Sequence, residues 1–453
     1  MKKIFINKIG RREFLKTSLS GLALTTLPGI SFAQSNPDVV VIGAGAAGLS
    51  ASAELMRRGI SFVCIEGMNR IGGRCYTDMS TFGVPADHGA HWLHGHKQNE
   101  IAIFGKKHKD KFKIYKEPDR SVVYDGGKKV NENKLWKIYK KIEKIRETSS
   151  DKPFMDLIPE KIKKNDWFDT AHKASMARDF GEFSSYDDSN NFYDPGWDSG
   201  NALCREGYGT LLAYYRKDVP VKLNTIVSEI KWGGQGVQVV TNKGTINAKA
   251  CIVTVSAGVL KAEKIKFTPA LPPRKYEALE SVSMTVSNRV LMQLKKKFYG
   301  KFKNDTNFYI KCNSNGAKSP ETIAYGLLKM SGTNVSLFGI SGQFSKDLEN
   351  EGSEAMIDFV LNKLKSTYGS KFYEKYFIKA IATGWANNPF TLGAYSGGVP
   401  GKSKKRRDIK FPVGDRIFFA GEATAGAFST VHGANRSGIR VATDVYISPA
   451  LES

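Results

Sequence analysis

One stretch near the N-terminus decides the fold: Val39-Val40-Val41-Ile42-Gly43-Ala44-Gly45-Ala46-Ala47-Gly48. Its first four residues are apolar and β-branched, which is typical of a parallel strand buried on both faces. After the glycine-rich turn, helix-forming residues run from Leu49 to Arg58 and stop at Gly59. Ser61 to Ile65 is predicted to form a second strand, which ends on Glu66. The stretch therefore predicts a βαβ unit.

The spacing of small and acidic residues in this unit favours dinucleotide binding. Gly43 permits the tight turn, Gly45 lets the backbone approach a pyrophosphate, and Gly48 allows the helix to pack closely on the strand. The helix N-terminus then presents free N–H groups and the positive end of its dipole to the phosphates. Glu66 follows Gly43 by 23 positions, where a carboxylate can accept hydrogen bonds from a ribose diol. A chance glycine turn is the alternative, but the strand, the helix and the acidic residue follow one another at the spacing that dinucleotide binding requires.

Composition narrows the class of protein. The 453 residues are 41% apolar and 25% charged, enough to bury a large core, and the length favours two interleaved domains. The five cysteines are odd in number and scattered, so they indicate neither a disulfide framework nor a metal site. The formal net charge is +24, with lysine-rich runs such as 137–144 and 402–407. Such runs are usually solvated faces, with polyanion or membrane-surface binding as the alternative. Because no aromatic pattern is interleaved with them, we expect no nucleic-acid partner.

Residues 1–33 differ from the rest of the chain. A basic segment precedes an apolar stretch from Leu19 to Leu27 that is too short to span a bilayer. The pair Arg11-Arg12 resembles a twin-arginine export signal, and Ser31-Phe32-Ala33 offers small residues for cleavage. A frayed basic tail is the alternative. We expect the twin-arginine export machinery to carry the folded protein to the periplasm, without stable membrane insertion.

Later segments indicate which dinucleotide is bound. They are Arg70-Ile71-Gly72-Gly73-Arg74-Cys75-Tyr76-Thr77, Asp87-His88-Gly89-Ala90-His91-Trp92-Leu93-His94-Gly95, Asp415-Arg416-Ile417-Phe418-Phe419-Ala420-Gly421-Glu422 and Thr430-Val431-His432-Gly433-Ala434. Trp385, Pro389 and Gly393-Ala394-Tyr395-Ser396 lie between the second and third. Taken in order, these segments resemble the motifs of the flavin amine oxidase family, and the second is similar to the segment that passes the flavin in polyamine oxidases. The resemblance covers nearly all of the chain after the leader and is weakest from 106 to 200.

The resemblance implies FAD as the cofactor, held by residues from several parts of the chain. In the family, paired glycines and an arginine close over the pyrophosphate, and Val227 falls where adenine is contacted. The cofactor-binding residues expected on this basis are Gly43, Gly45, Ala46, Ala47, Gly48, Glu66, Gly72, Gly73, Arg74, Gly89, Ala90, His91, Trp92, Val227, Gly421, Glu422, Thr430 and Val431. Ala394 stands where members with covalently bound flavin carry a cysteine, so we expect FAD to be held without a covalent bond.

The resemblance also implies residues near the reacting atoms. Tyr395 and Trp385 would form aromatic walls beside the flavin and grip an amine by π contacts. His91 is similar to a histidine that polyamine oxidases place in the substrate channel. Simple packing is the alternative for these side chains. Arg289 stands where most members carry a lysine bonded through water to flavin N5; because arginine stays protonated, it could stabilise anionic reduced flavin but could not pass a proton on, which bears on oxygen reactivity.

Residues 179–198 form a strip in which six acids alternate with aromatic residues: Asp179, Glu182, Asp187, Asp188, Asp194 and Asp198. In a basic protein such a strip could collect a cationic substrate at the mouth of the site. An ordinary polar loop is the alternative.

The function expected from these motifs is oxidation of a polyamine-like or other primary or secondary amine. Hydride would pass from the carbon next to an uncharged amine to flavin N5, the imine would be hydrolysed to a carbonyl, and O2 would reoxidise the flavin to give H2O2. Three alternatives stay open. One is an L-amino-acid oxidase or tryptophan 2-monooxygenase type, with Arg289 or Arg205 holding the carboxylate. Another is an amine dehydrogenase that uses a periplasmic electron carrier, and the third is a catalytically silent flavin-fold binding protein.

The predicted fold class is α/β, with a Rossmann-type FAD-binding domain and a discontinuous α+β substrate-binding domain. The FAD-binding domain is expected to comprise residues 36–96, 201–283 and 385–449. The substrate domain is expected to comprise residues 97–200, as a helical insert, and 284–384.

Overall fold

The structure is a computed structural model that describes residues 36–146, 150–176, 199–313 and 321–451. The expected leader and the acidic strip of residues 179–198 lie outside these residues. The described residues belong to one compact unit that begins at Asn36. Among them, no helix combines the length and apolar character needed to cross a membrane.

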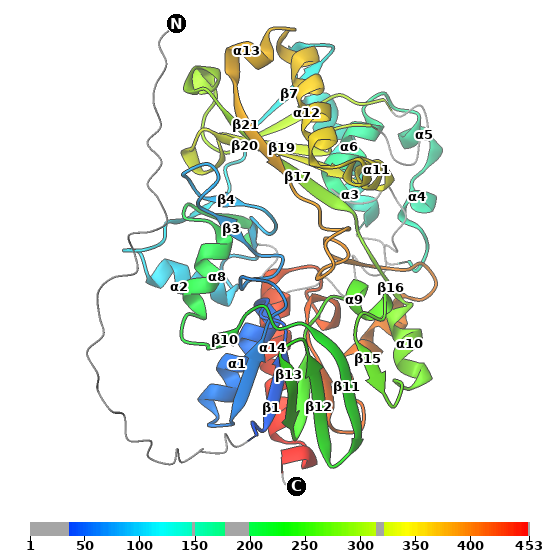
Figure 1. The fold of residues 1–453 in the computed structure, drawn as a ribbon. Coiled ribbons are helices and arrows are strands. Elements are labelled where there is room, and N and C mark those ends of the chain that lie inside the picture. Colours follow the sequence, from blue (N-terminus) through cyan, green and yellow to red (C-terminus); the bar gives the residue numbers. More distant parts are fainter. Residues whose placement is uncertain (1–35, 147–149, 177–198, 314–320, 452–453) are drawn as a thin grey trace, which may run out of the picture. The chain divides into compact units, whose positions relative to one another are not determined.

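A parallel five-stranded sheet contains the predicted βαβ unit (Figure 1). Its order is β10 (Val221–Lys222), β2 (Phe62–Ile65), β1 (Val39–Ile42), β14 (Ala250–Val253) and β23 (Ile417–Phe419). All neighbouring pairs run parallel. Every residue of β1 is buried, as its apolar run predicts. Val39 and Val41 pack into one hydrophobic cluster and Val40 and Ile42 into another, because successive side chains of a strand point to opposite faces.

Helices from both ends of the chain cover one face of this sheet. In Figure 1, α1 (Ala46–Arg57) and α14 (Val431–Tyr446) lie beside β1, and the two helices pack on each other. The remaining elements of this half are α8 (Tyr208–Tyr215), α9 (Ala257–Lys261), α10 (Pro273–Leu279) and the 3-10 helices η4 (Ser403–Lys410), η5 (Glu422–Thr424) and η6 (Pro449–Leu451). A second sheet has the order β13 (Gly244–Ala248), β12 (Gly236–Thr241), β11 (Val227–Gly234) and β15 (Lys266–Thr268).

A seven-stranded sheet forms the other half of the molecule. Its order is β21 (Phe377–Ala382), β17 (Ser287–Leu294), β20 (Val335–Ser341), β19 (Tyr325–Leu328), β18 (Thr306–Ile310), β7 (Ser121–Asp125) and β8 (Lys128–Val130). Its accompanying elements are α11 (Gln343–Glu351), α12 (Ser353–Tyr368), α13 (Phe372–Tyr376), η2 (Lys296–Lys301) and η3 (Met330–Gly332). Helix α12 packs on β17 and β21 and so supports strand β17, which carries Arg289.

The insert over residues 97–200, which was expected to be helical, also contains strands. The helices among its described residues are α2 (Glu100–Lys107), α3 (Asn133–Arg146), α4 (Phe154–Leu157), α5 (Glu160–Lys163) and α6 (Phe168–Met176). Between α2 and α3, however, lie β6 (Ile114–Lys116), β7 and β8, and β7 pairs in parallel with β18. Val122, Val123 and Tyr124 are buried. β-branched and aromatic side chains fit a pleated surface well, so this short segment joins the sheet although lysine-rich helices surround it.

Three small sheets carry site residues between the two halves of the fold. They pair β3 (Thr77–Asp78) with β4 (Ala86–Asp87), β16 (Val282–Met284) with β22 (Ser396–Gly398), and β5 (Leu93–His94) and β6 with β9 (Asn201–Cys204). The fold therefore has the predicted α/β class, with a dinucleotide-binding sheet assembled from three separate stretches of chain.

Candidate active site

A cavity of about 1120 Å³ lies at the carboxyl ends of the parallel strands, where Ile42, Ile65, Thr254 and Gly421 reach its wall. This edge is where ligands bind in open α/β sheets. Ligand cavities typically measure about 300–1,000 Å³, so this one has room for a large cofactor and a second molecule. Every residue predicted for cofactor binding or catalysis lines it except Gly48.

The glycine-rich turn gives the cavity one wall. Gly45 precedes α1 as its N-cap residue with φ −75°, and a Cβ built on it meets no atom within 4 Å. No side chain caps α1, and its first turn holds no acid, so its free N–H groups and dipole face the cavity. The arrangement suits the approach of a phosphate to the backbone.

Gly48 serves a different purpose from Gly45. A Cβ on Gly48 would lie 1.8 Å from the carbonyl oxygen of Gly43 and 2.9 Å from the Thr254 hydroxyl. Its lack of a side chain lets α1 start directly above the turn, which is the packing task that its place in the motif predicts. It lies behind the cavity wall rather than on it.

Glu66 closes the next strand and is anchored at the same wall. One carboxylate oxygen accepts a hydrogen bond from the Ala44 amide at 2.7 Å, and the other accepts from the Met68 amide at 2.9 Å. The side chain is only 6% exposed. Its position beside the glycine turn, on the cavity, suits a ribose hydroxyl as a further partner.

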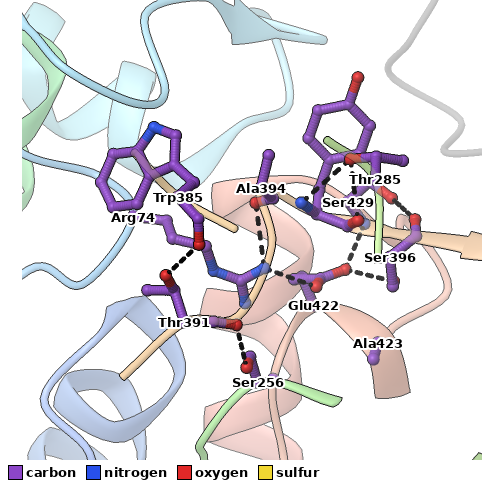
Figure 2. Close-up of polar contacts among 12 residues, drawn as sticks. Arg74, Ser256, Thr285, Trp385, Thr391, Ala394, Ser396, Glu422, Ala423 and Ser429 are labelled. Carbon is purple, nitrogen blue, oxygen red and sulfur yellow. Dashed lines mark hydrogen bonds and ion pairs between the residues drawn. The ribbon is translucent and has the colours of Figure 1, made fainter. Parts of the chain in front are cut away.

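An ion pair joins the first and last parts of the dinucleotide-binding half (Figure 2). Arg74 donates from Nη1 to Glu422 Oε1 at 3.0 Å and to the Ala394 carbonyl at 3.1 Å. Glu422 Oε2 accepts from the Ser396 hydroxyl at 2.6 Å and from the Ser429 amide at 3.1 Å. These residues come from three stretches of the chain, at residue 74, residues 394–396 and residues 422–429, so this network fixes the cavity wall where the three stretches meet.

The electrostatics of the network keep Glu422 ionised. Burial by itself would raise the pKa of this carboxyl, but the guanidiniums of Arg74 and Arg406 and the hydrogen bond from Ser396 outweigh it, and the pKa is lowered. Arg406 is 4% exposed, and its guanidinium carbon lies 3.9 Å from the centre of the Phe428 ring. The wall is therefore held by a buried cluster of compensated charges.

Trp385 and Tyr395, the predicted aromatic walls, both line the cavity. The Trp385 carbonyl accepts from the Thr391 hydroxyl at 2.8 Å, and the Thr391 carbonyl in turn accepts from Ser256 (Figure 2). The Trp385 amide donates to the Asn288 side chain at 3.1 Å. These bonds hold the loop that carries both rings.

His91 lies on the cavity wall but is only 2% exposed. Its Nδ1 is 2.7 Å from Asp87 Oδ2, and its ring packs edge-on against Trp92 with centroids 5.1 Å apart. Asp87 also accepts hydrogen bonds from Thr77 and the Tyr208 amide. Because the ring is almost fully enclosed, the geometry favours a positioning role for His91 over direct contact with substrate.

Arg289 projects from β17 into the cavity, where three groups surround it. Its Nη1 donates to the Asp87 carbonyl and its Nε to the Tyr325 hydroxyl, each at 3.4 Å. Its guanidinium carbon lies 5.4 Å from the centre of the Trp92 ring. The long hydrogen bonds leave donors for an anionic or electron-rich partner.

A polar chain that the sequence did not predict lies on the same cavity. Glu117 accepts from Trp92 Nε1 through Oε1 and from Asn201 Nδ2 through Oε2, both at 2.8 Å. Asn201 Oδ1 lies 2.7 Å from His94 Nδ1, which assigns the proton of that ring to Nδ1. Burial lowers the pKa of His94 to about 4, so its ring is neutral at physiological pH. Within the described residues, Glu117 has neutral donors and no ion-pair partner.

Aromatic and acidic side chains from α3 and the seven-stranded sheet complete the lining. Trp136 packs edge-on against Tyr139 and Tyr309, with ring centroids 5.1 Å and 5.6 Å apart. Asp119 and Glu143 contribute further carboxylates to the lining. Sequence reasoning missed these residues. The helical spacing of Trp136, Tyr139 and Glu143, which places them on one side of α3, could have identified them.

The residues present fit FAD. An open glycine cradle, the uncapped start of α1 and the first turn of α14 meet at the cavity. Glu66 stands at the end of β2, and Val227 lies at the start of β11 on the same wall. The donors suit a diphosphate and the carboxylate suits a ribose, as an FAD site requires.

Comparisons with known proteins agree with this geometry. Family models for flavin containing amine oxidoreductases and for NAD(P)-binding Rossmann-like domains match residues 191–446 and 41–104, respectively. Polyamine oxidase 4 of Oryza sativa subsp. japonica is 29% identical over 458 residues, covering 90% of this chain and 88% of that protein. Polyamine oxidase 2 of Arabidopsis thaliana is 28% identical over 450 residues, with 90% and 88% covered.

Solved structures show the same fold. Wild-type putrescine oxidase bound to putrescine matches with a TM-score of 0.71 at 18% identity, covering 90% of this chain and 99% of that one. The amine oxidoreductase model spans more than half of the sequence, and the cavity fits its cofactor. The chain therefore belongs to the flavin-containing amine oxidoreductase family and is an FAD-dependent enzyme.

Proposed function

We propose that this enzyme oxidises a polyamine-like amine with at least two nitrogens. The observation that carries the proposal is Glu117, a carboxylate on the cavity wall that has neutral hydrogen-bond donors but no cation among the described residues. A substrate ammonium would supply the missing charge. Asp119 and Glu143 extend this acidic lining.

The proposed reaction removes hydride from the carbon next to an uncharged amine nitrogen, with bound FAD as its acceptor and O2 as the final oxidant, giving H2O2. Water hydrolyses the resulting imine to a carbonyl compound. Glu117 binds a nitrogen that stays charged, and the aromatic rings of Trp385 and Tyr395 orient the nitrogen that reacts. Arg289 offers fixed positive charge where negative charge builds during the reaction.

The neighbours of Glu117 support this division of tasks. His94 is neutral at physiological pH, so the polar chain from His94 through Asn201 to Glu117 does not carry a competing positive charge. Trp136, Tyr139 and Tyr309 line the cavity and favour the methylene segments of a flexible amine. The cavity therefore offers a charged contact and an apolar path to one extended molecule.

The test mixes the FAD-loaded enzyme without oxygen with putrescine, spermidine, benzylamine and L-leucine in turn. We expect the yellow absorbance to bleach fastest with the diamine and triamine, and peroxide to appear when air is admitted. Faster bleaching by L-leucine would replace the proposal with amino-acid oxidation through Arg289. Bleaching by an amine without peroxide in air would indicate a different electron acceptor.

A substitution at Glu117 distinguishes the effect of its negative charge from an effect on the fold. Glu117→Gln keeps the shape of the side chain and one acceptor oxygen but removes the charge and replaces the other oxygen by an NH2 donor. KM for spermidine should therefore rise by about tenfold or more while KM for benzylamine changes little. Asp110→Asn is the matched control, because Asp110 is an exposed acid whose side chain is 72% accessible and does not line the cavity. Equal effects of the Glu117 change on both amines would contradict the proposal.

A further inference from the structure

One side of α3 carries lysines that the proposed reaction does not use. Lys134, Lys137, Lys140, Lys141 and Lys144 are all exposed. At about 100° per residue they fall within about 120° of the helix circumference. We call this set the lysine stripe.

The other two sides of α3 already have partners. Leu135 and Ile138 are buried in a hydrophobic cluster. Trp136, Tyr139 and Glu143 line the cavity. The helix thus has an apolar side, a cavity side and a basic side, and its acid Glu143 belongs to the cavity side. The basic side is the one without a structural or catalytic task.

The charges of the lysine stripe have no counter-charge in the part of the chain that the structure describes. None of its ammonium groups takes part in an ion pair there. Other surface lysines do: Lys405 lies 2.7 Å from Glu277, and Lys311 lies 3.2 Å from Asp125. Glu132, which precedes the helix, accepts a hydrogen bond from Ser121 instead. The stripe is therefore an uncompensated positive surface.

We propose that the lysine stripe docks the enzyme on an anionic lipid surface. Four to eight basic residues gathered on an amphipathic helix are typical of sites for anionic headgroups. From Lys134 to Lys144 the stripe spans about 15 Å of straight helix, which presents its charges together to a flat surface. Lys128 and Lys129 on β8 are exposed and precede the helix.

The composition of the lysine stripe distinguishes a lipid surface from a nucleic acid. The stripe has no aromatic residue on which a base could stack and no arginine to hold a phosphate with two parallel hydrogen bonds. Lysine ammoniums are point charges on flexible stems, which suit mobile headgroups. Because the stripe also has no exposed apolar residue, the attachment would be electrostatic and would weaken with salt.

Docking of this kind would help a basic enzyme to meet a cationic substrate. The chain carries a formal net charge of +24, which repels amines in free solution. An anionic surface gathers both the enzyme and multivalent amines, so the two meet where each is concentrated. Lipid binding itself does not depend on the identity of the substrate.

The test is sedimentation of the FAD-loaded enzyme with vesicles of phosphatidylcholine alone or with about one third phosphatidylglycerol. We expect binding only to the anionic vesicles, and less of it as ionic strength rises. The variant Lys134→Gln, Lys137→Gln, Lys141→Gln and Lys144→Gln should lower the partition coefficient by at least about tenfold. Its kcat for amine oxidation at saturating substrate in solution should be unchanged, which verifies folding.

The control variant changes Lys296, Lys297, Lys301 and Lys303 to Gln, four exposed lysines in and next to η2. It loses the same net charge, so a partition coefficient within about twofold of the parent supports a specific stripe. Equal loss in both variants would show a general charge effect and overturn the proposal. So would tighter, stripe-dependent binding to heparin or a DNA oligonucleotide than to the vesicles, or equal binding to neutral vesicles.

Discussion

Two glycines of the same turn, three positions apart, have opposite surroundings. Gly45 faces open cavity with a φ that other residues adopt readily, whereas Gly48 is pressed against the Gly43 carbonyl. A side chain at position 45 is therefore compatible with folding, whereas a side chain at position 48 is not. Gly45 is therefore expected to matter for cofactor binding, and Gly48 for the stability of the fold.

We predict that Gly45→Val leaves the unfolding free energy of the cofactor-free protein nearly unchanged but weakens FAD binding by at least about tenfold, since the new side chain would occupy the phosphate approach. Gly48→Ala should destabilise the cofactor-free protein by about 1–3 kcal/mol or more through overpacking. Urea unfolding and FAD titration measure the two effects. A Gly45→Val protein that unfolds as early as Gly48→Ala would contradict this assignment.

At the residue scale, the sequence predicted the cofactor side of the cavity better than the substrate side. Glycines, Glu66 and Arg74 belong to contiguous motifs, so their spacing carried the information. Glu117 and Asn201 meet only because β6 pairs with β9, a contact between distant segments that no local pattern encodes. His94 belonged to a recognised segment, yet the sequence singled out the more enclosed His91 instead.

At the scale of elements, long periodic segments were predictable and short ones were not. The first strand, the helix after it and the second strand agree with the structure within a few residues. β7 was missed because five residues between lysine-rich helices carry a weak periodic signal, and pairing with β18 decides their conformation. The same pairing brings the loop after β6, with Glu117, to the cavity.

The pair of Arg74 and Glu422 links elements from opposite ends of the chain, so its loss should loosen the cavity wall. Glu422→Gln is expected to lower the stability of the FAD-saturated protein by about 1.5–3 kcal/mol at neutral pH. The folded state lowers the pKa of Glu422, so this contribution is present above its ordinary value of 4.5 and is lost as the pH falls through the lowered pKa. The difference in unfolding midpoint between parent and variant should therefore shrink below about pH 4.5.

Glu277→Gln is the control for this change. Its exposed ion pair with Lys405 has a similar separation of 2.7 Å, but solvent screens the two charges. We therefore expect no measurable change in the unfolding midpoint of this variant at any pH. A constant difference between parent and Glu422→Gln across the acid range would mean that packing, rather than ionisation, accounts for the loss.

For the whole molecule, two electrostatic effects oppose each other. Carboxylates on the cavity wall attract an amine at short range, while a net charge of +24 repels it at long range. The wall carboxylates act only after the substrate has entered the cavity, where little salt screens their charge. The substrate approaches through solvent, where salt screens the repulsion by the net positive charge. At low ionic strength the Debye length exceeds about 10 Å, so the repulsion governs the encounter.

We therefore predict that kcat/KM for spermidine in free solution rises by about two- to tenfold as salt is added up to physiological ionic strength. An enzyme whose surface charge attracts its substrate shows the reverse, because salt weakens the attraction. Benzylamine carries a single charge, so its slope against the square root of ionic strength should be about one third as steep. Steady-state rates over a sodium chloride series measure both slopes. A fall in kcat/KM for spermidine with salt would mean that acidic groups near the entrance dominate the field, and that the basic surface lies too far from the path of the substrate to repel it.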